Sequence, residues 1–442
     1  MNMHATVSDR FRPIQYLGNK TRLLDEIAQA VESVVAPQGV VADLFSGTAV
    51  VGRRLAQRNA VVAVDVQAYA EVLGRAMLQG DAEDLAHFDV RQFLARAEAA
   101  ADTLARLFAP MMRREEYALA ALRAGDPQSI SEIIEGGSPL SMMAGTSGSA
   151  LPEGVRALAS QYAGHGLDAT ATLAFGGVYF AFVQGIWLDA LHHAAIQEPE
   201  HRRNVLLAVM LGVASEVVNT VGKQFAQPIR LLDKRGASKP LLMQRTLRDR
   251  GLDVRDLFLV LLGRWRGALA DGGSSHRVER ANVDAFLESD SSFDAAYADP
   301  PYTIDHYSRF YHVLETLVRR DQPVLSQMRK KGIPTIMRGL YREDRFQSDF
   351  CIPSKAPQAF HRLFWGVARR GVPLVLSYSG HVDAGGQRPR TLAVDELAAL
   401  ARRSFRSVEI TEPTFEGHRK LNAAHRNAST ESGSERLLIC RS

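Results

Sequence analysis

Two adjacent prolines restrict what the middle of this 442-residue chain can form. The run FDAAYA at positions 293–298 is short, apolar and typical of a strand, and Asp299-Pro300-Pro301-Tyr302 follows it directly. Neither proline has an N–H to donate to a sheet ladder, so the strand must end there. In open α/β sheets, ligands bind at the carboxyl ends of the strands. The sequence therefore predicts a strand that presents a carboxylate, a stiff backbone and an aromatic ring to a ligand.

These four residues suit attack by a planar amino group. The nitrogen of an aromatic amine is a weak nucleophile because its lone pair is delocalised into the ring. Two acceptors on its hydrogens, the Asp299 carboxylate and the Pro300 carbonyl, would draw it towards tetrahedral geometry, and Tyr302 could stack on the base. Such a site would act by positioning the amine and by preorganised electrostatic stabilisation, without a covalent intermediate. The plain alternative is a proline turn in which Asp299 is a cap and Tyr302 packs nearby.

Two earlier apolar runs also lead into acids. Asp43 lies at the end of the first run and is followed by Phe45 and Gly47 in a tight turn, where glycine lets the backbone approach a ligand. The run at 61–65 ends in Asp65, and an acid at the end of the second strand of a Rossmann-like unit is placed to bind ribose hydroxyls. A G-x-G-x-x-G fingerprint is absent here. The alternative role for Asp65 is a helix cap.

The segment from Tyr16 to Arg22 precedes these strands and contains Gly18, Asn19 and Lys20. Glycine and asparagine favour a turn, and a helical pattern follows. Free N–H groups and a lysine at the start of a helix suit a carboxylate or phosphate. The alternative is a capped surface helix.

The pattern changes between the first strands and the proline motif. Residues 84–122 and the apolar stretches 171–196 and 205–221 indicate helices, and residues 125–154, rich in Gly, Ser, Met and Pro, indicate a loop. Basic side chains accumulate here: Arg202, Arg203, Lys223, Arg230, Lys234, Arg235, Lys239, Arg245, Arg248 and Arg250. We interpret this region as a helical insertion whose basic face contacts nucleic acid, the alternative being a solvated helix face.

Composition sets the remaining limits. A hydrophobic content of 46% and a charged content of 23% predict a globular protein, and the net charge of +4 permits a polyanionic partner. The two cysteines, Cys351 and Cys440, form neither a disulfide framework nor a metal cluster and fit the cytosol. Residues 1–15 lack an apolar secretory segment, and the stretch 175–191 carries Gln184 and Asp189, so we expect no membrane span.

The order of these motifs, YLGNK, DLFSGTAVVG, VVAVD, a helical insertion, VDAFL and YADPPY, resembles the Dam-like adenine-specific DNA methyltransferases. The resemblance implies a Rossmann-like, S-adenosylmethionine-dependent α/β fold. Its catalytic domain would comprise residues 1–80 and 279–442. A largely helical target-recognition domain would comprise residues 81–278 and bind double-stranded DNA. Residues 219–225 loosely resemble an Asn-Gly-Phe element of that domain.

The resemblance also implies roles for single residues. Those near the methionine end of the cofactor would be Tyr16, Gly18, Asn19 and Lys20. Those of the cofactor loop would be Asp43, Phe45 and Gly47. Asp65 would bind the ribose and Asp284 the adenine amino group of the cofactor. The flipped target base would meet Asp299, Pro300, Pro301 and Tyr302.

Other functions remain open at this level. These are methylation of the cytosine N4 amine, methylation of RNA or protein, and a catalytically silent nucleic-acid-binding module. An aspartate at position 299, where cytosine-amine enzymes more often have serine, favours adenine. A carbon-5 cytosine enzyme needs a cysteine nucleophile, which the catalytic motif lacks. The recognition sequence and the oligomeric state are not defined by the sequence.

Overall fold

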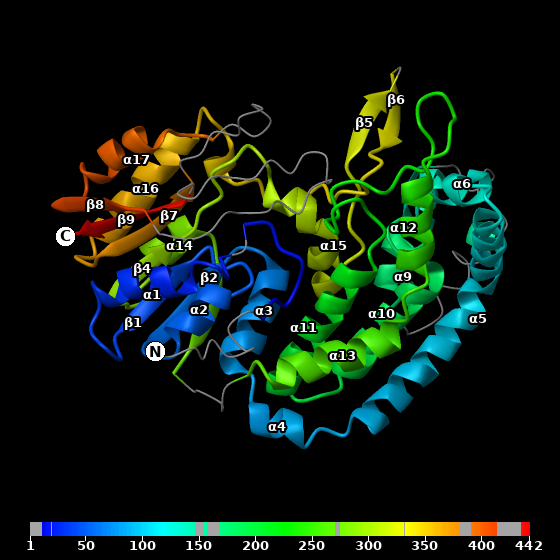
Figure 1. Cartoon of the computed structure of the whole chain (residues 1–442), viewed down its shortest axis with the longest axis horizontal. Helices are drawn as coiled ribbons and strands as arrows, with labels where there is room; N and C mark the ends of the chain where they lie inside the picture. The colour runs from blue at the N-terminus through cyan, green and yellow to red at the C-terminus, as the bar shows by residue number, and fades with distance from the viewer. Residues whose placement is uncertain are drawn as a thin grey trace. The chain divides into compact units, whose positions relative to one another are not determined.

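A computed structural model describes residues 11–18, 20–145, 154–156, 168–269, 275–330, 332–379, 390–412 and 435–442. The chain divides into two compact units (Figure 1). The first, here called the sheet unit, comprises Met1–Leu85, Arg266–Ser308 and Phe346–Ser442. The second, the helical unit, comprises Ala86–Trp265 and Arg309–Arg345. Residues 309–345, which we assigned by sequence to the catalytic domain, thus pack with the helical unit.

The sheet unit is built on a seven-stranded sheet in the order β3-β2-β1-β4-β7-β9-β8. Its strands are β1 (Val40–Leu44), β2 (Ala60–Asp65), β3 (Arg277–Arg280), β4 (Ala295–Ala298), β7 (Leu374–Ser379), β8 (Ser407–Thr411) and β9 (Glu435–Arg441). The strands from β3 to β7 are parallel, whereas β9 runs antiparallel between β7 and β8. The predicted α/β class is confirmed.

Helices cover both faces of this sheet, which explains why the central strands are continuous apolar runs. One core contains side chains of α1 (Leu24–Glu32) and α2 (Val50–Leu55). The other contains side chains of α14 (Val283–Glu288), α16 (Ala356–Ala368) and α17 (Val394–Ala401). The helix α3 (Ala68–Gln79) follows β2 and contacts β3.

The register of the central strands brings their carboxyl ends together. Leu44 at the end of β1 is paired with Val64 of β2 on one side and with Ala298 of β4 on the other. The residues that follow these strands therefore meet at one edge of the sheet, where ligands of open α/β folds bind.

The helical unit consists mainly of α5 (Val90–Arg123), α6 (Gln128–Gly136), α7 (Pro139–Gly145), α9 (Thr170–Phe175), α10 (Phe182–Ala195), α11 (Glu200–Val217), α12 (Pro240–Arg250) and α13 (Val254–Arg266). It also holds the hairpin of β5 (Gln327–Lys330) and β6 (Ile333–Ile336). The short helix α4 (Ala82–Ala86) precedes α5, and α15 (Tyr307–Arg319) begins in the sheet unit.

The loop predicted at 125–154 was wrong over 128–145, because α6 and α7 form there, and residues 146–153 lie outside the described residues. The i, i+3, i+4 spacing of Ile130, Ile133 and Ile134 buries one face of α6, and this burial outweighs the surrounding glycines. The stretch 171–196 is also two helices instead of one, since the chain turns at Gly177, which has a φ of +78°.

Candidate active site

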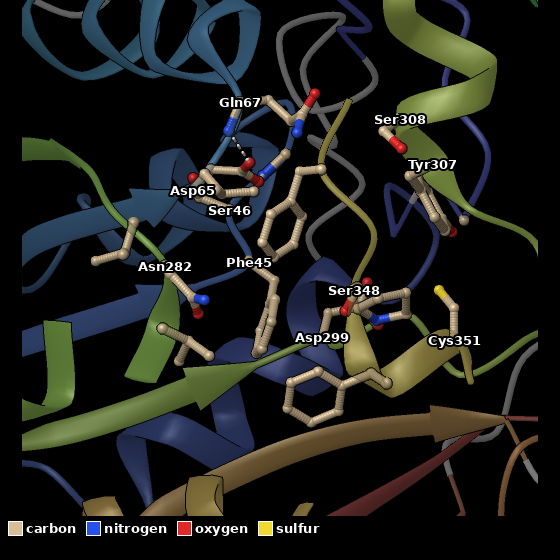
Figure 2. Close-up of a pocket in the computed structure, with 18 of the residues that line it drawn as sticks. Phe45, Ser46, Asp65, Gln67, Asn282, Asp299, Tyr307, Ser308, Ser348 and Cys351 are labelled. Atoms are coloured by element: carbon tan, nitrogen blue, oxygen red, sulfur yellow. Dashed lines mark hydrogen bonds between the residues drawn. The ribbon is translucent and has the colours of Figure 1, made fainter. Parts of the chain in front are cut away.

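A cavity of about 210 Å³ lies in the sheet unit at the carboxyl ends of β1, β2 and β4 (Figure 2). Most of the residues selected from the sequence line it: Tyr16, Gly18, Lys20, Asp43, Phe45, Gly47, Asp65, Asp284, Asp299 and Pro301. Pro300 and Tyr302 adjoin this lining in the chain without being part of it. Asn19 lies outside the described residues.

Three residues in the turn after β1 have a left-handed backbone conformation. Phe45, Gly47 and Ala49 have φ values of +63°, +52° and +56°. Such values are costly for residues other than glycine, and strained turns of this kind cluster at ligand sites. A side chain at position 47 would also place its Cβ 2.8 Å from the hydroxyl of Tyr16, so only glycine fits.

Asp65 is held by the backbone of two loops. Its carboxylate accepts the N–H of Gly47 at 3.0 Å and that of Gln67 at 2.9 Å, the second of which is drawn in Figure 2. Burial raises the pKa of Asp65, and these N–H groups oppose the rise. A carboxylate has about four lone-pair sites, so Asp65 can accept further hydrogen bonds from a ligand.

Asp43 is the most deeply buried acid of the cavity, with 1% of its surface exposed. Its Oδ2 atom has no hydrogen-bond partner among the described residues. Burial raises the pKa of Asp43 to about 8, against the influence of the nearby Gly52 N–H, and the charges of Asp299 and Asp65 add to the rise. The side chain is therefore neutral at pH 7 until a ligand brings positive charge or hydrogen-bond donors.

The carboxylate of Asp299 is anchored by a buried lysine. The Nζ atom of Lys20 lies 3.1 Å from Oδ1 of Asp299 and donates to Oε1 of Glu435 at 2.7 Å. Lys20 and Glu435 are both buried, whereas the side chain of Asp299 keeps 22% of its surface exposed. The lysine thus fixes the position of Asp299 while leaving part of its carboxylate open.

Electrostatics within this triad set the protonation of Asp299. Burial raises the pKa of Asp299 to about 6, Lys20 opposes the rise, and the charge of Glu435 adds to it. Burial alone would lower the pKa of Lys20, but Asp299 and Glu435 together raise it well above its usual value. At neutral pH the triad therefore holds an ammonium between two carboxylates, with Asp299 ionised.

The ring of Tyr302 already has neighbours. It lies 5.2 Å from the ring of Tyr378, between centroids, with Lys20 5.5 Å and Arg390 4.9 Å from its own centroid. These cations hold the ring in place through its π face. The packed tyrosine considered as the plain alternative is thus present.

Asp284 sits in the first turn of α14 and is paired within the cavity. Its Oδ2 accepts the Nε–H of Arg362 at 2.9 Å, and Arg362 also binds Asp349. The predicted acceptor for the cofactor amine therefore shares its carboxylate with a guanidinium.

Sequence reasoning missed several residues of this site. Gln67 could have been found, because it follows Asp65 by two positions and begins a helix. Glu435 carried no signal, since it is 415 residues from Lys20 and belongs to no motif. Phe350, whose ring centroid lies 5.2 Å from that of Phe45, and Arg362 come from segments of ordinary composition.

Comparison with protein families supports the interpretation of the motifs. Residues 16–108 match the family model of the D12 class N6 adenine-specific DNA methyltransferases. Over these residues the chain is similar to the D12 class, and the predicted resemblance is confirmed. The D12 segment contains the cavity residues from Tyr16 to Asp65, whereas the proline motif at Asp299 lies beyond it.

A curated relative supports the same family resemblance. A stretch of 138 residues, 30% of this chain, is 33% identical to the modification methylase LlaI of Lactococcus lactis subsp. lactis. The match spans only 20% of the length of that relative.

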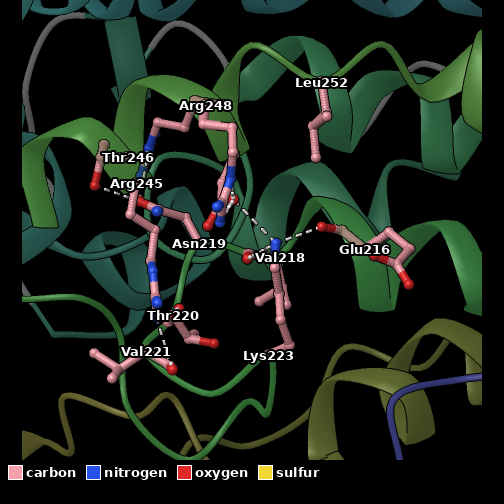
Figure 3. Close-up of polar contacts among 12 residues, drawn as sticks. Glu216, Val218, Asn219, Thr220, Val221, Lys223, Arg245, Thr246, Arg248 and Leu252 are labelled. Atoms are coloured by element: carbon pink, nitrogen blue, oxygen red, sulfur yellow. Dashed lines mark hydrogen bonds and ion pairs between the residues drawn. The ribbon is translucent and has the colours of Figure 1, made fainter. Parts of the chain in front are cut away.

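Several basic residues of the helical unit are engaged within it, and Figure 3 shows three of them, Lys223, Arg245 and Arg248. The Nζ atom of Lys223 lies 3.1 Å from Oδ1 of the buried Asp249 and donates to the carbonyls of Glu216 and Val218 at the end of α11. Arg245 donates to the Val221 carbonyl. Many charges counted in the sequence thus stabilise the unit itself.

No described helix is long and apolar enough to cross a bilayer. Within the same described residues, no three His, Cys, Asp or Glu side chains are grouped to hold a metal ion.

Proposed function

We propose that this chain transfers a methyl group from S-adenosylmethionine to the N6 amine of adenine in double-stranded DNA. The observation that supports this most is the position of Asp299. Asp299 is held by Lys20 and lines the same cavity as Asp65 and the turn from Asp43 to Gly47. Asp65 and that turn belong to the segment that matches the D12 family model. In this proposal the sheet unit is catalytic and the helical unit selects the DNA site.

The cavity suits a cationic cofactor. Burial raises the pKa of three of the acids that line it, Asp43, Asp65 and Asp299. A ligand that brings positive charge into such a site offsets the cost of ionising them. S-adenosylmethionine carries a sulfonium and an ammonium group, and it supplies an activated methyl group when bound.

The residues proposed to hold this cofactor all line the cavity. Asp65, fixed by two backbone N–H groups, is proposed to accept the ribose hydroxyls, and Asp284 the adenine amino group. Tyr16, Gly18 and Lys20 are proposed to lie near the methionine end. The glycine at position 47 leaves room that a side chain would fill.

The chemistry at the target amine rests on Asp299 and Pro300. The open part of the Asp299 carboxylate accepts one N–H of the amine, and the Pro300 carbonyl is proposed to accept the other. Lys20 holds Asp299 before the reaction, so this acceptor needs little reorganisation in the transition state. The base must leave the duplex, at a cost of a few kcal/mol. Stacking on an aromatic ring such as Tyr302 returns about 1–3 kcal/mol of this.

The test is incubation with labelled S-adenosylmethionine and mixed-sequence duplex DNA, followed by digestion and mass analysis of the nucleosides. We expect N6-methyladenine. Asp299→Ala should slow transfer by about a hundredfold or more, as for other preorganised acceptors, with cofactor binding retained. Asp290→Ala, an exposed acid of the same unit, is the control.

If methyl groups appear on cytosine alone, the target is the N4 amine of cytosine and not the N6 amine of adenine. Binding of DNA without any transfer would instead favour a catalytically silent module.

A further inference from the structure

Two arginines of the helical unit share one buried tyrosine. The Cζ atoms of Arg309 and Arg345 lie 5.0 Å and 5.6 Å from the ring centroid of Tyr341. Arg309 also donates its Nε–H to the Tyr341 hydroxyl at 3.0 Å. Tyr341 is fully buried, while Arg309 is exposed and Arg345 is half-buried.

Neither guanidinium has an acidic partner among the described residues. Other arginines of the segment 309–345 do pair with carboxylates: Arg319, Arg320, Arg338 and Arg342. The Nε atom of Arg345 is buried without a hydrogen-bond partner in the described part of the chain. Burial lowers the pKa of Arg345, and the charge of Arg309 lowers it further. The pair thus concentrates positive charge that nothing in the described residues neutralises.

We propose that Arg309 and Arg345 bind phosphodiester groups of a DNA backbone. Guanidinium groups present forked donors that match phosphate oxygens and remain charged when partly desolvated. The tyrosine orients them, because its hydroxyl is fixed by Gln227, whose Nε2 donates to it at 2.7 Å. The site rests on the proposed function for the identity of its ligand.

The position of Arg309 in the chain fits this role. It follows Tyr307, which lines the cavity, by two residues within the helix α15. A phosphate bound here would position the DNA without reading its sequence.

The first experiment measures binding of a fluorescent 20-base-pair duplex at several salt concentrations to wild type, Arg309→Gln, Arg345→Gln and the double variant. Arg255→Gln removes an exposed arginine of α13 that already pairs with Glu98 in the same unit, and it is the matched control. We expect the slope of log Kd against log salt to shrink by about 1 for each phosphate that a variant no longer binds. Arg345→Lys should retain the slope, because it retains the charge.

A second measurement does not depend on methyl transfer or on DNA. Inorganic phosphate should raise the thermal midpoint of wild type and of Arg255→Gln more than that of the double variant. If wild type transfers no methyl group yet shows this difference, the proposed function fails and the anion site stands. If the double variant matches the control in both its salt slope and its phosphate response, the site is refuted while the methyltransferase proposal stands.

Discussion

Replacing Asp43 by asparagine should stabilise the sheet unit at neutral and alkaline pH. In the folded protein the pKa of Asp43 is about 8, compared with 3.8 for the free side chain. Between these values the folded state keeps a proton that the unfolded state loses, so stability falls as pH rises. The slope is about 1.4 kcal/mol per pH unit, which gives an upper bound of about 4 kcal/mol at pH 7. Asparagine has nearly the same shape and does not ionise.

The assay is chemical unfolding of the full chain without cofactor between pH 5 and pH 8. The stability advantage of Asp43→Asn over wild type should be at most about 2 kcal/mol near pH 5 and should grow steadily towards pH 8. Asp290→Asn, which removes an exposed carboxylate, controls for net charge. A constant difference between Asp43→Asn and wild type across this range would refute the reasoning, since it would mean that Asp43 ionises normally in the folded protein.

Three further outcomes are expected. The rate of methyl transfer should fall as pH drops through about 6, where Asp299 becomes protonated. Glu435→Gln should shift this fall in the pH–rate profile to lower pH, because it removes a charge that raises the pKa of Asp299. An unshifted profile would contradict the role of Glu435 in the triad. Asp65→Ala should weaken cofactor binding by about 1–3 kcal/mol, measured by calorimetry, because the ribose hydroxyls would be left without their acceptor. Lys223→Met should cost about 1–3 kcal/mol of unfolding free energy, because it leaves the buried Asp249 with fewer partners. Unchanged denaturation together with weaker DNA binding would show that Lys223 faces the DNA instead.

The sequence was most informative where local chemistry decides the structure. An apolar run followed by Asp65, or by Asp299 and two prolines, defines both a buried strand and its end, and parallel pairing then gathers these ends at one edge. Glu435 could not be found this way. Its role depends on β9 running antiparallel beside β7, a long-range pairing that no local pattern near Glu435 encodes.

The sequence does not show which basic side chains are paired within the folded protein. A lysine in a basic stretch looks available to DNA, yet Lys223 directs its donors to Asp249 and to the end of α11. Arg309 and Arg345 lie outside that stretch, and the sequence did not single them out. Among the described residues, however, they have no acidic partner. What makes a cation available to a polyanion is the absence of an internal partner, and partners are set by folding. The proposed DNA-binding surface should therefore contain arginines without acidic partners, and Arg309 and Arg345 meet that condition.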